Sequence, residues 1–63
     1  MKENRKLKGY RVAKGISQKE MADHLGVGQT AYSKKESGKV AFRQEEINLL
    51  LELLEVKYED IFF

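Results

Sequence analysis

The stretch that decides the fold runs from residue 17 to residue 38 and reads SQKEMADHLGVGQTAYSKKESG. Ser17 followed three residues later by Glu20 has the spacing of a capping box, which begins a helix. Gly26 has the place of a glycine that ends a helix in the left-handed conformation. Only Val27 and Gly28 then separate this helix from the next polar run. The stretch therefore predicts helices over 18–25 and 29–37, joined by a tight turn.

Apolar and small residues in this stretch have the spacing of a helix-turn-helix, in which two short helices cross closely. Counting from Gln18, a small residue is needed at the fifth position and a glycine at the ninth, and Ala22 and Gly26 stand there. An ordinary helical hairpin in a small bundle is the alternative, but it does not require this spacing. The motif's fourth, eighth, tenth and fifteenth positions are apolar: Met21, Leu25, Val27 and Tyr32.

One further helix is predicted before the motif and two after it. The first runs from about Asn4 to Lys14, before Gly15, and the last from Lys57 to Phe62. Between them, a loop over 38–43 leads to a helix that begins near Gln44. The expected core-facing residues of these helices are Leu7, Tyr10 and Val12, then Ile47, Leu50, Leu51 and Leu54, then Ile61 and Phe62.

Size and composition limit the fold and the class of protein. The chain has 63 residues and no cysteine, so we expect one domain over 1–63 without disulfides. With the five helices predicted above, this domain is expected to have an all-α compact five-helix fold. No apolar run approaches the roughly 20 residues of a membrane span, and the N-terminus is charged rather than apolar. We therefore expect a soluble cytoplasmic protein with no membrane partner.

Charge is distributed unevenly along the chain. The net charge of +2 divides into +5 over residues 1–14, +2 over residues 15–43 and −5 over residues 44–63. A basic front and an acidic back suit a protein that docks one side on a polyanion such as nucleic acid. Solvated helix surface is the alternative that charge alone leaves open.

Segments 17–22, 25–27 and 32–39 resemble the signature of the Cro/C1-type (Xre-like) helix-turn-helix family, to which lambdoid phage repressors belong. The resemblance extends from about Arg5 to Phe62. It implies a lambda-repressor-like DNA-binding domain and sequence-specific binding of double-stranded DNA. It further implies a small transcriptional regulator, expected to be a repressor, that acts as a homodimer on a palindromic operator.

The resemblance also implies roles for particular residues. In the recognition helix, Gln29 and Thr30 match positions that read bases, and Ser33 and Lys34, one turn further on, are expected to read bases with them. A glutamine amide can pair with adenine N6 and N7, and Lys34 can reach guanine or a phosphate. Gln18 matches a residue that binds the DNA backbone and braces the recognition helix, and we expect Ser17, Lys39 and Arg43 to contact the backbone as well. Each of these could instead be solvated helix surface, and Arg43 could enter the minor groove.

Four residues concern the seating of the recognition helix. Arg11 and Glu36 resemble a family pair that forms a buried salt bridge between the first and third helices. Lys35 departs from the family, which commonly has an apolar residue there, so we expect its side chain to reach the surface or the helix to pack less deeply. Gly28 stands where a serine or threonine cap is common, which costs a few tenths of a kcal/mol.

Other functions find less support in the sequence. Leu49, Leu53 and the terminal Phe62-Phe63 suggest a dimer surface, unless the fourth helix is buried on nearly all sides. The same apolar C-terminus would serve a protein-interaction module, such as an antitoxin-like partner. We expect no enzyme, because the chain has a single histidine, His24, and shows neither a phosphate loop nor paired carboxylates. No cofactor, metal or small-molecule ligand is expected.

Overall fold

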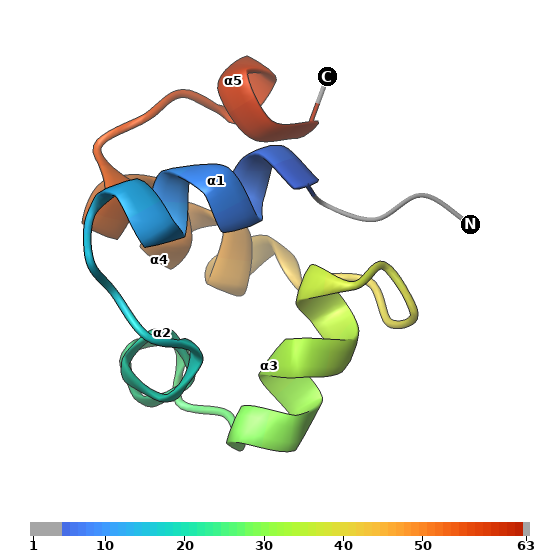
Figure 1. Cartoon of the computed structure of the whole chain (residues 1–63). Helices are drawn as coiled ribbons and strands as arrows, with labels where there is room; N and C mark the ends of the chain where they lie inside the picture. Colours follow the sequence, from blue (N-terminus) through green and yellow to red (C-terminus); the bar gives the residue numbers. More distant parts are fainter. Residues whose placement is uncertain (1–4, 63) are drawn as a thin grey trace.

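The computed structural model describes residues 5–62, in which the regular structure consists of five helices and no strand. The helices are α1 (Arg5–Ala13), α2 (Gln18–Leu25), α3 (Gln29–Glu36), α4 (Gln44–Leu54) and α5 (Tyr58–Phe62). In Figure 1, α1 crosses in front of α4, α5 lies above α1, and α2 and α3 form the lower part of the molecule. The predicted all-α five-helix fold is confirmed, with helix ends within one residue of the prediction wherever both lie in the described part.

The ends of α2 are fixed by local hydrogen bonds. The Ser17 hydroxyl accepts from the Glu20 backbone N–H at 3.0 Å, and Glu20 Oε1 accepts from the Ser17 N–H at 2.9 Å. At the other end Gly26 has φ +75°, so the helix ends in the left-handed conformation that favours glycine. Both the capping box and the left-handed glycine are therefore confirmed.

All five helices contribute to one apolar core. Phe42, in the loop before α4, extends this core, because its ring lies 6.1 Å from those of Tyr32 and Phe62, centroid to centroid. The loop thereby closes the core between α3 and α5. The buried apolar residues are Leu7, Met21, Ala22, Leu25, Tyr32, Leu50, Leu54 and Ile61.

The prediction for the buried face of α1 is partly wrong. Leu7 is fully buried, but Tyr10 is 37% exposed and Val12 59% exposed. The inward face instead carries Leu7 and Arg11, which are four residues apart and therefore on one side of the helix. The apolar pattern missed this face because its second member is an arginine.

The buried row of α4 is also shifted from the prediction. Glu46, Leu50 and Leu54 are buried at four-residue spacing, whereas Ile47 and Leu51 are half-buried. Leu49 and Leu53, predicted as surplus apolar surface, are half-buried and pack against the core, and so does Phe62. Phe63 lies outside the described residues. Most of the apolar residues that suggested a dimer surface therefore pack against the core of the same chain.

Candidate nucleic-acid interface

The second helix of the motif, α3, packs on α2 and α1, and it is anchored by its last residue, Glu36. Arg11 reaches across from α1 and donates from Nε to Glu36 Oε2 at 2.8 Å and from Nη2 to Oε1 at 3.2 Å. The third donor of Arg11, Nη1, bonds the Ile16 carbonyl at 2.7 Å. The structure thus brings Arg11 and Glu36 together as a two-point ion pair between α1 and α3.

Two more side chains complete the hydrogen bonding of Glu36. Tyr32 donates its hydroxyl to Oε2 at 2.7 Å, and Gln18 donates from Nε2 to Oε1 at 3.1 Å. Each carboxylate oxygen therefore accepts two hydrogen bonds, which is its full capacity. Three helices meet at this carboxylate, and we call Glu36 with Arg11, Gln18 and Tyr32 the Glu36 cluster.

The ionisation of the Glu36 cluster follows from these contacts. Burial acts to raise the pKa of Glu36, but hydrogen bonds from Arg11, Tyr32 and Gln18 outweigh it, so the pKa is lowered. Burial, and then the hydrogen bond to Glu36, raises the pKa of Tyr32. The hydrogen bond to Glu36 raises the pKa of Arg11, although burial opposes it. The cluster is therefore an ionised carboxylate and guanidinium with a neutral phenol.

The proposed base-reading residues lie on the solvent side of α3. Gln29, Thr30 and Lys34 are exposed, and Ser33 is half-buried. They occupy the first turn of α3 and the turn that follows it. Gly28 precedes them as the N-cap without a side-chain hydrogen bond. In Figure 1 the start of α3 reaches the lower edge of the molecule, on the side away from α5. This end of the helix is open to a large partner.

The proposed backbone-binding residues surround α3. Lys39 and Arg43 are exposed on the loop after α3, and the backbone N–H of Lys39 donates to the Lys34 carbonyl at 2.9 Å. Ser17 is exposed, and its hydroxyl already caps α2. Gln18 is half-buried with its amide nitrogen on Glu36. Gln18 is thus a brace between α2 and α3.

Lys35, which was expected to reach the surface or to weaken the packing of α3, is buried. Its side chain is only 11% exposed, and Nζ lies 2.7 Å from Glu46 Oε1 and 2.6 Å from Oε2. The expectation that Lys35 reaches the surface is wrong, because a buried carboxylate compensates the ammonium charge. Only a weak signal for this pair is present in the sequence, since Lys35 stands at the family's apolar position and Glu46 lies in the first turn of α4.

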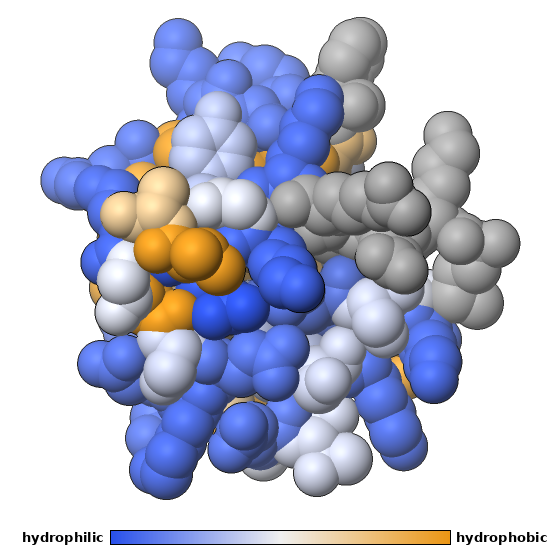
Figure 2. All heavy atoms as spheres, in the orientation of Figure 1, coloured by the Kyte–Doolittle hydropathy of each residue, from blue (hydrophilic) through white to orange (hydrophobic). Residues whose placement is uncertain are grey.

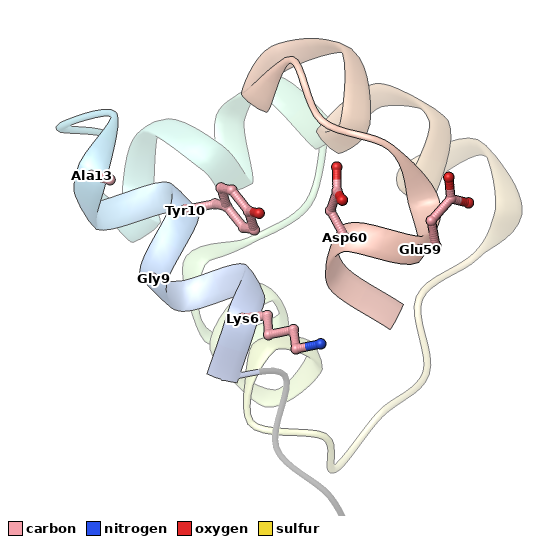
Figure 3. Close-up of a pocket in the computed structure, with 6 residues that line it drawn as sticks. All are labelled: Lys6, Gly9, Tyr10, Ala13, Glu59 and Asp60. Atoms are coloured by element: carbon pink, nitrogen blue, oxygen red, sulfur yellow. The ribbon is translucent and has the colours of Figure 1, made fainter. Parts of the chain in front are cut away.

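A second surface feature lies apart from α3. An open groove runs between α1 and α5, and Tyr10 and Lys6 extend into it from α1 (Figure 3). It explains why Tyr10 is exposed, but it brings together no set of groups that would hold a metal. Its lining residues are Lys6, Gly9, Tyr10, Ala13, Glu59 and Asp60.

The face drawn in Figure 2 is mainly hydrophilic, with a small cluster of apolar atoms near the end of α1. Over residues 5–62, no three histidine, cysteine, aspartate or glutamate side chains are grouped as metal ligands would be. None of the helices in that range is both long enough and apolar enough to cross a bilayer.

The fold and the spacing of α2 and α3 define the class of protein as a helix-turn-helix domain. The chain belongs to the Cro/C1-type helix-turn-helix family, whose pattern matches residues 7–61. This family consists of DNA-binding regulators and is generally non-enzymatic. No curated protein matches the sequence.

Proposed function

We propose that the protein binds double-stranded DNA sequence-specifically, as a small transcriptional regulator that acts as a repressor in the cytoplasm. The recognition helix α3 enters the major groove, where Gln29, Thr30, Ser33 and Lys34 meet base edges. Ser17, Gln18, Lys39 and Arg43 bind the phosphate backbone. Such contacts position a protein on the duplex without reading sequence.

One observation carries this proposal: α3 is exposed along its first turn and anchored along its opposite side. Gln29 and Thr30 face solvent, whereas Tyr32 and Glu36 are buried and hydrogen-bonded to each other at 2.7 Å. A rigid helix with polar side chains at its open end suits direct reading of base edges, because such reading needs donors and acceptors at fixed positions.

Selection of bound duplexes from a random pool tests the proposal. We expect a preferred sequence, and Gln29→Ala should weaken its binding by about 1–3 kcal/mol and relax one base position. Lys39→Ala should weaken all duplexes alike and reduce the salt slope by about 1. Lys57→Ala, which removes an exposed cation in the acidic segment, is the matched control and should leave the slope unchanged. An unchanged preferred sequence after replacing both Gln29 and Thr30 would contradict the base-reading assignment.

We further propose that the protein acts as a homodimer on a palindromic operator. One recognition helix offers few base contacts, and two linked half-sites multiply the specificity. The selected duplexes should then show twofold symmetry with half-sites about one helical turn apart. A single asymmetric site, together with a 1:1 complex in light scattering, would contradict the dimer.

A protein-interaction module remains the alternative function. It would use the apolar C-terminus, but Phe62 packs against the core and against the rings of Phe42 and Tyr58. This packing favours DNA binding over an apolar docking role. The absence of any binding to random duplex DNA at low salt would favour the interaction module instead.

A further inference from the structure

The buried pair of Lys35 and Glu46 joins the recognition helix to the helix after the loop. The backbones of α3 and α4 are not among the closely packed helix pairs of the fold. The long side chain of Lys35 spans the space between them and ends on both oxygens of Glu46. The two side chains are 11% and 6% exposed, so water screens their attraction little.

Glu46 has a second role at the start of α4. It is the third residue of that helix, and its Oε1 accepts the backbone N–H of Arg43 at 2.8 Å. Arg43 is the N-cap residue, and its own side chain makes no capping hydrogen bond. One carboxylate therefore fixes both Lys35 of α3 and the backbone at residue 43, where the loop ends.

The other end of the loop is fixed to α3 directly. The Lys34 carbonyl accepts from the backbone N–H of Lys39 at 2.9 Å and of Val40 at 3.3 Å. Loop 37–43 is thus held to α3 at its beginning and, through Glu46, at its end. This loop carries Lys39 and Arg43, the exposed cations assigned to the DNA backbone.

We propose that the Lys35–Glu46 pair positions loop 37–43 against α3, so that the backbone-binding cations and the base-reading residues act on the same stretch of duplex. The proposal rests on the DNA-binding function proposed above. Buried ion pairs often add little net stability compared with apolar residues, but they act only in a defined geometry. A positioning role therefore explains a charged pair at a place where apolar packing would suffice.

The double variant Lys35→Met/Glu46→Gln tests this role. Methionine keeps much of the lysine stem, and the glutamine oxygen can still accept the Arg43 N–H, so the cap survives while the ion pair is lost. The matched control is Lys14→Met/Glu55→Gln, which removes an exposed ion pair with a 2.6 Å separation by the same substitutions. Both variants leave the net charge of the protein unchanged.

Affinity for the selected duplex and for random duplex is measured at one salt concentration, after thermal melting shows that each variant is folded. We expect the specificity ratio of the pair variant to fall about tenfold, with random-duplex affinity within about twofold of the wild type. The control variant should match the wild type in both. A lower melting temperature with an unchanged ratio would overturn the positioning role and leave the pair structural.

Amide hydrogen exchange separates this proposal from the DNA-binding function itself. In the free pair variant, exchange of the Arg43 amide, at the loop end that residue 46 holds, should accelerate at least about fivefold relative to the amides of α2. Unchanged exchange would overturn the proposal, whether or not DNA is bound. Failure of the wild-type protein to bind any duplex would overturn the DNA-binding function alone.

Discussion

The two helices of the motif have the same length of eight residues but are held in the fold by different kinds of contact. The buried residues of α2 are Met21, Ala22 and Leu25, which pack without directional bonds. Those of α3 are Tyr32, Lys35 and Glu36, which bond through defined polar atoms. Helix α2 can therefore adjust to small changes of side-chain volume, whereas α3 depends on a few hydrogen bonds with strict geometry.

Truncation of Glu36 should have the largest effect on this comparison. In Glu36→Ala the Arg11 guanidinium stays buried without its carboxylate, and we expect the free energy of unfolding to fall by about 3–5 kcal/mol. Urea unfolding followed by circular dichroism measures this loss. Glu52→Ala, at an exposed position of α4, is the control and should change stability by less than about 0.5 kcal/mol. A loss below about 1 kcal/mol for Glu36→Ala would show that apolar packing alone holds α3.

Lowering the pH should have the second-largest effect, because it weakens the contacts that hold α3. The pKa values of Glu36 and Glu46 are lowered below the ordinary 4.5, because hydrogen bonds from their partners outweigh burial. A carboxyl group with a lowered folded pKa contributes stability above its unfolded pKa and loses it as pH falls through the folded pKa. We expect stability to be level from pH 7 to about 5 and to fall below about 4.5. The protonated groups keep their shape, so the effect should be smaller than that of Glu36→Ala.

Unfolding curves at several pH values check this expectation. Lys35→Met/Glu46→Gln, which lacks one of the two carboxylates, should lose less stability in acid than the wild type. Leu25→Val in α2 should lose about 1 kcal/mol at every pH, because it removes only apolar contact. The Glu20 and Glu55 carboxyls also have lowered pKa values, but both are exposed to solvent screening. A flat profile between pH 6 and pH 3 would contradict a polar anchor for α3.

Removal of one hydroxyl should have the smallest effect. Tyr32→Phe keeps the buried ring but removes the 2.7 Å hydrogen bond to Glu36, and we expect a loss of about 1.5–3 kcal/mol. Thermal melting measures it. Tyr58→Phe, at a half-exposed position, should leave the melting temperature unchanged. Equal melting temperatures for Tyr32→Phe and the wild type would show that the Tyr32 hydroxyl does not stabilise the Glu36 cluster.

The same contrast explains how far the sequence predicts the fold. The capping box at Ser17 and the left-handed glycine at 26 are local, so their spacing is visible in the chain. The inward position of Arg11 was expected only from the family resemblance, because the apolar pattern pointed to Tyr10 and Val12. The pairing of Lys35 with Glu46 was not predicted, since it depends on the path of the loop between them. Local rules thus account for α2, and tertiary contacts account for α3.

The Glu36 cluster also affects how the protein can change by mutation. Its four side chains share one carboxylate, so their substitutions should be strongly non-additive, and most single changes would leave a buried polar group unpaired. Gln29 and Thr30 lie outside the cluster on the exposed side of the same helix. Their replacements should be close to neutral for folding. Under the proposed DNA-binding function, new sequence preferences would therefore arise one residue at a time on a helix whose attachment is resistant to stepwise change.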